Sequence, residues 1–237
     1  PLQHPCLDWE QRCTRTGQSR DAARALWIDC FKHGRLPGEL ASAIHIKSVE
    51  SPDGTTKFLV RLPDGHETES VILPLTGKGG RVRNTLCLSS QVGCAMGCRF
   101  CETAQMGLIR HLGVAEILLQ WHVATHHFRK EIRNIVFMGM GEPLDNVEAV
   151  IGAIRVLTDR RGPSMASRRI AISTVGRIDG IRKLSKFVTD SKIRNLRLAV
   201  SVNASDDETR SEIMPLNRSM NMSKLRSALE ARTARDW

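Results

Sequence analysis

The chain has 237 residues, 41% of them hydrophobic, and its 35 Lys and Arg against 25 Asp and Glu give a formal net charge of +10. This size and composition suit one large globular domain or two small ones and exclude a disordered chain, and no apolar run is long enough for a transmembrane helix. The basic excess fits a polyanion such as nucleic acid, or equally a solubilising surface charge, whereas the absence of Tyr argues against an RRM-type base-stacking platform.

The start of the chain and its cysteines indicate where the protein works. The chain begins at Pro1 without a Met, so we expect a processed or incomplete chain, and it shows no signal-peptide pattern at this end. Four of the seven cysteines fall between residues 87 and 101, and an odd number so clustered is not a secreted disulfide framework. We therefore predict a reducing compartment, the cytoplasm, and a metal or cluster site.

The first 84 residues predict a helix and then strands. Ser19 is a good N-cap and Gly34 a good stop signal, so residues 19–34 predict a helix. Residues 44–73 predict three antiparallel strands, because Pro-Asp-Gly turns divide them at 52–54 and 63–65. The glycine-rich and basic residues 75–84 predict a mobile loop.

From residue 85 the pattern changes to alternating strands and helices. The predicted strands are 85–89, 134–138, 169–174 and 196–202, and the predicted helices are 114–128, 147–157, 178–187 and 223–235. Such alternation predicts an α/β fold with βα units and a parallel sheet. We therefore divide the chain into a helical accessory region, a small antiparallel module with its loop, and an α/β core, at 1–43, 44–84 and 85–237.

Three cysteines, Cys94, Cys98 and Cys101, have C-x3-C-x2-C spacing just after a predicted strand. Three thiolates so close can hold one soft metal centre. Zinc usually recruits a fourth Cys or His. An iron–sulfur cluster held by three thiolates instead keeps one iron open, where the amino and carboxylate groups of S-adenosylmethionine (SAM) can bind. We favour the open-iron cluster, with a zinc site and unrelated thiols as alternatives.

A second motif, residues 139–143 (GMGEP), follows the predicted strand 134–138. Glycines at the carboxyl end of a strand let a ligand approach the backbone, and in barrel folds that end carries the active site. Glu142 would pair with the ammonium group of SAM. The alternative is a plain βα turn, in which Gly and Pro are common.

Five segments resemble the RlmN/Cfr family of radical SAM methyltransferases: CLSSQVGCAMGCRFCETAQMG at 87–107, MGMGEPL at 138–144, ISTVG at 172–176, LAVSVN at 198–203 and IMPLN at 213–217. The resemblance implies a partial (βα) radical SAM barrel of parallel strands, preceded by a small helical and antiparallel-strand region. It also implies a 4Fe-4S cluster and SAM as cofactors. The implied activity is methylation of adenosine in RNA, at C2 in 23S ribosomal RNA and some tRNAs for RlmN-like members, or at C8 for Cfr-like members.

The resemblance also implies roles for single residues. In the family a methyl-carrying cysteine forms a covalent adduct with the base, which a second cysteine resolves. Cys87 matches the resolving cysteine, and Glu69 matches the base that takes a proton from the substrate carbon. The alternatives are a buried strand thiol and an exposed strand carboxylate. Six residues match SAM contacts: Gly141, Glu142, Ser173, Ser201, Val202 and Asn203, the last standing where many members have His.

The core lacks parts that the family usually has. Four of six βα units are present, and no cysteine follows Cys101 to carry the methyl group. We expect a fragment or a truncated protein, and an inactive cluster- and RNA-binding remnant is the alternative function. The expected partners are RNA and an electron donor such as flavodoxin or ferredoxin, with no membrane, and the expected state is a monomer.

Two further groups of side chains can be explained without a ligand. His122, His126 and His127 lie on a predicted helix without a partner motif, so we predict a structural or solvated role. Four arginines bracket a loop that we place near the strand-end face, where they either contact RNA phosphates or form a solvated surface. They are Arg160, Arg161, Arg168 and Arg169.

Overall fold

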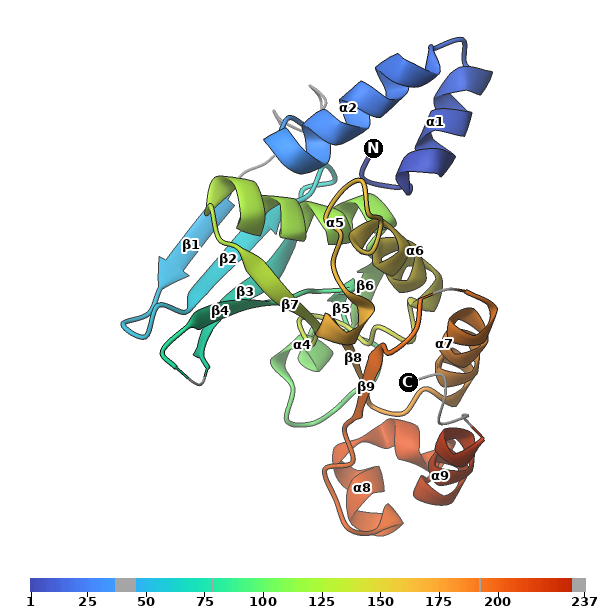
Figure 1. Cartoon of the computed structure of the whole chain (residues 1–237). Coiled ribbons are helices and arrows are strands. Elements are labelled where there is room, and N and C mark those ends of the chain that lie inside the picture. The colour runs from blue at the N-terminus through green and yellow to red at the C-terminus, as the bar shows by residue number, and fades with distance from the viewer. Residues whose placement is uncertain (37–45, 78, 192, 232–237) are drawn as a thin grey trace.

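The centre of the protein is a seven-stranded sheet in the order β1-β2-β3-β4-β7-β8-β9 (Figure 1). The computed structural model describes residues 1–36, 46–77, 79–191 and 193–231. The strands of the sheet are β1 (Ile46–Glu50), β2 (Thr56–Arg61), β3 (Glu67–Thr76), β4 (Val82–Cys87), β7 (Ile132–Phe137), β8 (Ile170–Thr174) and β9 (Arg197–Val200). The mixed α/β architecture with parallel strands is the predicted one.

The antiparallel half of the sheet follows the turn signals. β1, β2 and β3 pair antiparallel, with Gly54 and Gly65 at positive φ in the two Pro-Asp-Gly turns. The backbone there is left-handed, which only glycine adopts without strain. Three predicted strands are therefore confirmed, while residues 44 and 45 lie outside the described part.

The predicted mobile loop at 75–84 is wrong at both ends. β3 continues to Thr76 and β4 begins at Val82, so Leu75 pairs with Arg83 across an antiparallel hairpin. Gly77, Gly79, Gly80 and Arg81 lie between the two strands, whereas Arg83 belongs to β4. β4 pairs with β3 on one side and with β7, in parallel, on the other. The proposed domain boundary at 84 therefore lies inside a strand, and the three-region division stays a prediction.

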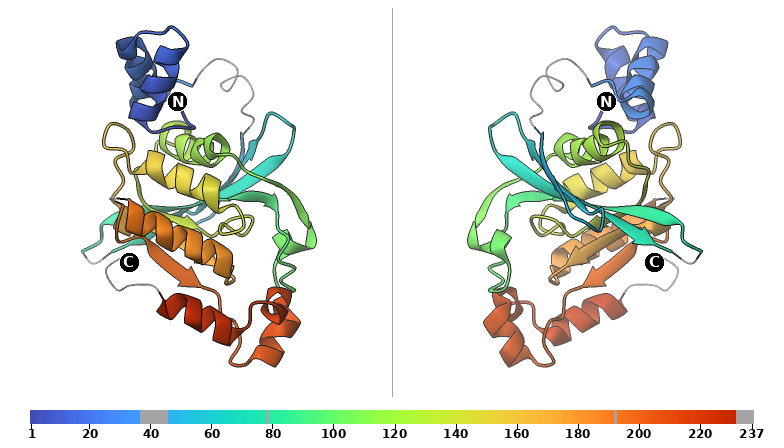
Figure 2. Two further views of the ribbon diagram at one scale, coloured as in Figure 1. Left: turned by 90° about the vertical axis from the view of Figure 1, so that its right-hand side faces the viewer. Right: turned by 90° about the vertical axis from the view of Figure 1, so that its left-hand side faces the viewer.

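Helices cover one face of the parallel half. They are α5 (Val114–His122), α6 (Val147–Leu157) and α7 (Ile178–Asp190), which lie one below the other in a single layer (Figure 2). Their apolar faces pack on fully buried strand residues such as Ile135, Phe137 and Ile172. The opposite face bears the alternate residues of the strands, including Cys87, Val136 and Ala171, which are neighbours in register. That face carries the candidate site at its carboxyl end.

Several elements were not predicted from the sequence. They are α1 (Cys6–Arg15), a two-stranded ribbon of β5 (Gln91–Gly93) and β6 (Leu108–His111), α4 (Glu102–Gln105), α8 (Asp207–Ile213), and the 3₁₀ turns η2 (Ser167–Arg169) and η3 (Pro215–Arg218). The predicted helix 114–128 divides into α5 and a π-helical turn, η1 (Val123–His127). The last helix, α9 (Met222–Glu230), ends before the residues that lie outside the description.

Two N-terminal helices, α1 and α2 (Arg20–His33), pack on top of the core. Ser19 caps α2 by accepting a hydrogen bond from the Ala22 amide, and Gly34 ends it in the left-handed conformation, as predicted. Glu10 is 1% exposed and bonds to both Arg20 and Arg24, which lowers its pKa to about 2. Within the described residues, no helix is both long and apolar enough to cross a membrane.

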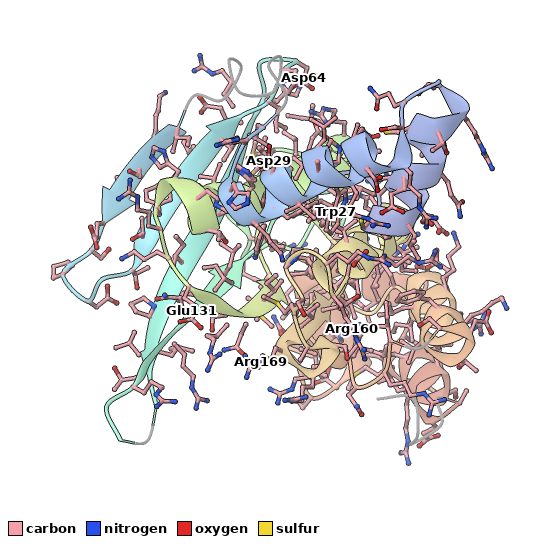
Figure 3. The ribbon with its side chains drawn as sticks, turned by 45° about the horizontal axis from the view of Figure 1, so that its top comes forward. Trp27, Asp29, Asp64, Glu131, Arg160 and Arg169 are labelled. Carbon is pink, nitrogen blue, oxygen red and sulfur yellow. The ribbon has the colours of Figure 1, made fainter. Side chains whose placement is uncertain are left out.

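The four arginines at 160–169 lie at the other end of the sheet from the candidate site, so their predicted position is wrong. Their loop connects the end of α6 to the start of β8, and therefore lies at the amino ends of the parallel strands. There it packs against α1 and α2: Asp159 accepts a hydrogen bond from the Cys6 amide, and Gly162 lies against Trp27. Figure 3 shows Trp27 on α2, together with Arg160 and Arg169 of this loop.

Candidate active site

The cysteine loop, residues 94–101, lies between the β5–β6 ribbon and α8 and is bonded to both. The Cys94 amide donates to the Gly107 carbonyl at 2.9 Å, and the Arg99 amide donates to the Ile213 carbonyl at 2.9 Å. Gly93 and Gly107, which face each other where the ribbon meets the loop, both have positive φ, and a Cβ on Gly93 would collide with the Gly107 backbone. The ribbon thus fixes the loop at its first cysteine and α8 fixes it near its last.

The three cysteines of the loop line one cavity. Cys94 and Cys98 are 7% and 4% exposed, Cys101 is half-buried, and none forms a disulfide. The same cavity is lined by Phe100, Gly139, Gly141, Glu142, Val175 and Ser201. Burial raises the pKa of Cys94 to about 11 and also raises the pKa of Cys98. Metal binding at these thiols would therefore release protons.

The donor set of the cysteine loop distinguishes a single metal ion from a cluster. In the described part of the chain, no three Cys, His, Asp or Glu side chains converge as ligands of a single metal ion would. A four-iron cluster is wider than one ion, so its thiolates stand farther apart. The loop offers three soft thiolates and no fourth protein ligand, facing a wall of backbone, serine and carboxylate. This arrangement fits a cluster with an open position better than a zinc ion.

Glu142 is a buried carboxylate that joins two strand ends. Its side chain is 3% exposed, and its two oxygens accept from the amides of Leu144 and Val175, each at 2.9 Å. Burial raises the pKa of Glu142, and these amide donors oppose the shift. No Lys, Arg or His in the described residues forms an ion pair with it. A buried carboxylate in this state is suited to receive a cationic ligand.

The glycines beside Glu142 are required by the protein's own packing. A Cβ on Gly139 would lie 2.6 Å from Ser89 Oγ, and a Cβ on Gly141, at φ 96°, would lie 2.5 Å from Gln91 Cβ. The Met140 carbonyl accepts from the Ser90 and Gln91 amides. The motif is thus held against residues 88–91. Close packing against these residues is therefore a second reason for the glycines, besides the predicted approach of a ligand to the backbone.

The later predicted SAM contacts fall into two groups. Ser201 lines the cysteine cavity, and its amide donates to the Thr174 carbonyl at 2.9 Å. Ser173 is half-buried on β8, pairs with Ala199 of β9, and does not line that cavity. Val202 is 42% exposed and its side chain lines a different hollow against α9. Asn203 is exposed and has φ 59°, a left-handed conformation that Asn tolerates better than most residues.

Cys87 and Glu69 lie on the same face of the sheet. Cys87 pairs with Val71 of β3, and Glu69 is two residues from Val71 on that strand. Burial raises the pKa of Cys87 to about 11, and the Glu69 charge adds to the effect. The Glu69 carboxylate pairs with Lys57 Nζ at 3.0 Å. The structure therefore brings the two predicted catalytic residues to adjacent strands, with the carboxylate partly open to solvent.

Polar residues that support the site were missed from the sequence. Gln91 is fully buried and accepts from the Glu142 amide at 2.7 Å, while the fully buried Gln120 bonds to both Ser70 and the Ser89 backbone. Arg210 is also fully buried, next to the strand ends. Only the position of Gln91 three residues before Cys94 could have suggested such a role.

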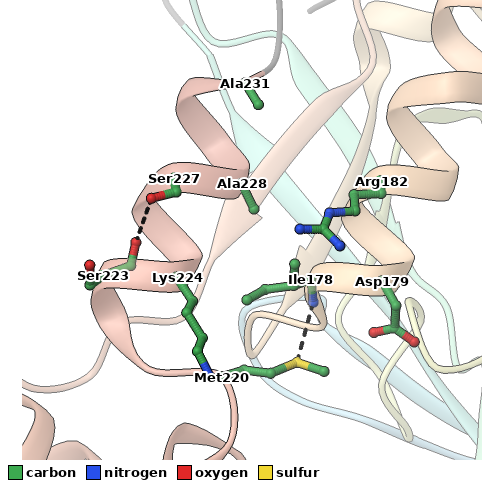
Figure 4. A pocket seen from close by; sticks show the side chains of 9 residues that line it. All are labelled: Ile178, Asp179, Arg182, Met220, Ser223, Lys224, Ser227, Ala228 and Ala231. Atoms are coloured by element: carbon green, nitrogen blue, oxygen red, sulfur yellow. Dashed lines mark hydrogen bonds between the residues drawn. The ribbon is translucent and has the colours of Figure 1, made fainter.

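A larger cavity, of about 460 Å³, lies between α7 and α9 (Figure 4). Met220, Ile178 and Ala228 line it, with Arg182 and Lys224 beside them. None of the predicted site residues lines this cavity, so size does not identify the site here. The convergence of thiols, a buried carboxylate and strand ends does.

Comparisons with known proteins agree with this geometry. Residues 88–232 match the family model described as "Radical SAM superfamily". The chain belongs to the radical SAM superfamily. A radical SAM methyltransferase from Sphaerobacter thermophilus, of known structure, is similar at 32% identity and a TM-score of 0.84, over 96% of this chain and 70% of that one. The predicted fold class is confirmed.

Curated relatives extend the likeness of this radical SAM protein. "Dual-specificity RNA methyltransferase RlmN" of Geotalea uraniireducens is 45% identical over 191 residues, which are 80% of this chain and 52% of that protein. "Probable dual-specificity RNA methyltransferase RlmN 1" of Protochlamydia amoebophila is 45% identical over 178 residues, 75% of this chain and 47% of that one. The resemblance to the RlmN/Cfr family is confirmed, and the chain spans about half the length of these relatives.

Proposed function

We propose that this chain forms the radical SAM core of an enzyme that methylates adenosine in RNA. The observation that carries the proposal is the cavity where Cys94, Cys98 and Cys101 face Glu142 and Ser201. Relatives named as dual-specificity RNA methyltransferases support the substrate, and their RlmN name supports C2 of adenosine over C8. The net charge of +10 suits an RNA partner in either ribosomal RNA or tRNA.

The proposed cofactors of the site are a 4Fe-4S cluster and SAM. Cys94, Cys98 and Cys101 would hold the cluster, which when bound supplies the electron that cleaves SAM. Glu142 would accept hydrogen bonds from the amino group of SAM, because its carboxylate is buried without a cationic partner. Gly141, Ser173, Ser201, Val202 and Asn203 would complete the SAM site at the strand ends.

Cys87 and Glu69 are the proposed catalytic residues of the methyl-transfer chemistry. Burial keeps the Cys87 thiol protonated at neutral pH, so it would need a base or a closer positive charge before it attacks a sulfur atom. Glu69 would take a proton from the substrate carbon, and its carboxylate pairs with Lys57 Nζ at 3.0 Å. The two lie on adjacent strands of one face, where a base could reach both.

The proposal also includes the setting in which the enzyme works. A protein that donates single electrons, such as flavodoxin or ferredoxin, would reduce the cluster, since no other redox group is implied by the described residues. We further propose a monomer in the cytoplasm that binds no membrane.

SAM cleavage by the reconstituted protein tests the proposed function. The chain is loaded anaerobically with iron and sulfide, reduced with dithionite and given SAM, and 5′-deoxyadenosine is measured. Wild type should produce it, Cys98→Ala should not, and Cys13→Ala, at a buried thiol on α1, should match wild type. A wild-type chain that assembles no cluster, or a cluster-loaded chain that leaves SAM intact, would contradict the proposal. Mass spectrometry of RNA that the protein has methylated should find 2-methyladenosine. Finding 8-methyladenosine instead would contradict the C2 assignment.

A further inference from the structure

Arg210 is a buried cation without a carboxylate partner. It lies on α8, is 0% exposed, and forms no ion pair within the described residues. Charged side chains are almost never fully buried unless they are paired. The position therefore demands a reason beyond packing.

The guanidinium of Arg210 ties together the ends of two neighbouring strands. Its Nε donates to the Val202 carbonyl at 2.9 Å, and its Nη2 donates to the carbonyls of Val175 at 2.6 Å and Ser201 at 3.2 Å. Val175 follows β8, whereas Ser201 and Val202 follow β9. The remaining Nη1 donates to Asn217 Oδ1 at 2.5 Å. Only a planar fork of donors reaches all four acceptors.

This bonding continues to the third strand end through one peptide group. The Val175 carbonyl accepts from Arg210, while the Val175 amide donates to Glu142 Oε2 at 2.9 Å. The strand ends of β7, β8 and β9 are therefore linked in the order Glu142, Val175, Arg210, Ser201. Asn217 holds the guanidinium from behind, and its own amide donates to the Asp207 carbonyl and carboxylate.

Arg210 also lies beside the cysteine loop. Its guanidinium donates to the Val175 and Ser201 carbonyls, and both of these residues line the cavity together with Cys98. Ile213, on the same helix, accepts the hydrogen bond from the Arg99 amide. Met214, fully buried, packs with Cys94, Met96 and Cys98. The helix that carries Arg210 is thus part of the wall of the cysteine cavity.

We propose that Arg210 is a positioning residue with two effects, which rest on the proposed function. It holds the strand ends of β8 and β9 in the arrangement that binds SAM. It also places a positive charge next to Val175 and Ser201 in the wall of the cysteine cavity, which favours the reduced cluster, because reduction adds one electron and makes the cluster more negative.

Two substitutions at Arg210 separate these effects. Arg210→Lys keeps the charge but loses the fork, so SAM affinity should fall about tenfold or more while the midpoint potential of the cluster stays near that of wild type. Arg210→Gln removes both, so SAM affinity should fall and the midpoint potential should shift to a more negative value. Arg218→Gln removes one exposed charge from η3 and should change neither quantity.

The measurements are SAM binding to the cluster-loaded protein and an EPR-monitored redox titration without SAM. An Arg210→Gln protein with wild-type SAM affinity and potential would overturn the inference. If Arg210→Gln does not fold, Arg210→Lys decides: unchanged SAM affinity in that variant would overturn it as well. Failure of wild type to assemble a cluster would instead contradict the proposed function, so the two failures are distinguishable.

Discussion

At the scale of single residues, Glu142 shows how the site depends on groups that cannot be exchanged for close analogues. Its two oxygens accept from two amides. In Glu142→Gln, the amide nitrogen would face one of those N–H donors, so one buried hydrogen bond is lost. We expect a loss of about 1–3 kcal/mol in the free energy of unfolding, together with weaker SAM binding.

Denaturant unfolding and SAM titration check this prediction. Glu148→Gln is the control, because Glu148 is 76% exposed and pairs with Lys183 across the surface. An unfolding free energy in Glu142→Gln equal to that of the control would mean that the Glu142 bonds contribute nothing.

Gly141 gives a second prediction at this scale. In Gly141→Ala the new methyl group would have to occupy a left-handed backbone position and also displace Gln91, which lies 2.5 Å from the Cβ site. Gly17 has a similar φ, 87°, but a Cβ there would meet no atom of the described residues within 4 Å. Gly17→Ala should therefore cost only the backbone strain, about 1–2 kcal/mol, and Gly141→Ala clearly more. Equal changes in unfolding free energy in the two variants would disprove the packing argument.

At the scale of elements, the sequence predicts best where local chemistry decides. The Pro-Asp-Gly turns, the Ser19 cap and the α6 apolar face all place elements correctly, and α6 has the predicted bounds. Helix α1 was missed because Pro5 at its N-cap offers no side-chain acceptor. The β5–β6 ribbon was missed because β5 has three residues and pairs with a strand beyond the cysteine loop. Long-range pairing leaves no local signature.

Burial of His122, the last residue of α5, makes the folding stability depend on pH. His122 is 5% exposed, and burial, with a smaller effect from the His126 charge, lowers its pKa from 6.5 to about 4. Its ring lies 4.5 Å from that of His126. Below pH 6.5 His122 therefore becomes protonated in the unfolded chain, whereas in the folded chain it stays neutral until the pH falls to about 4. Stability should fall as pH falls through this window.

His122→Gln tests this dependence. The free energy of unfolding of the variant should fall less than that of wild type as the pH is lowered from 6.5 to 4. His127→Gln, at an exposed position on η1, is the control and should keep the wild-type profile. A His122→Gln profile parallel to wild type would show that another group causes the dependence.

At the scale of the whole molecule, one continuous sheet joins the antiparallel and parallel halves, and α5, α6 and α7 cover one face of the parallel half. Motif spacing predicted the cysteine loop, the GMGEP turn and the strand ends as one site. It could not show that Arg210 and Gln91 support them, because both act through backbone groups of distant segments. Nor could it place the four arginines, whose position depends on the end of the sheet at which their loop lies.

We propose that Cys94, Cys98 and Cys101 hold a four-iron cluster whose remaining iron is open to SAM. The most direct measurement is iron analysis with EPR of the reduced, reconstituted protein before and after SAM is added. We expect about four irons per chain and an EPR signal that changes on SAM addition, with both lost in Cys94→Ala. A stoichiometric zinc content, or a cluster signal that SAM leaves unchanged, would contradict it.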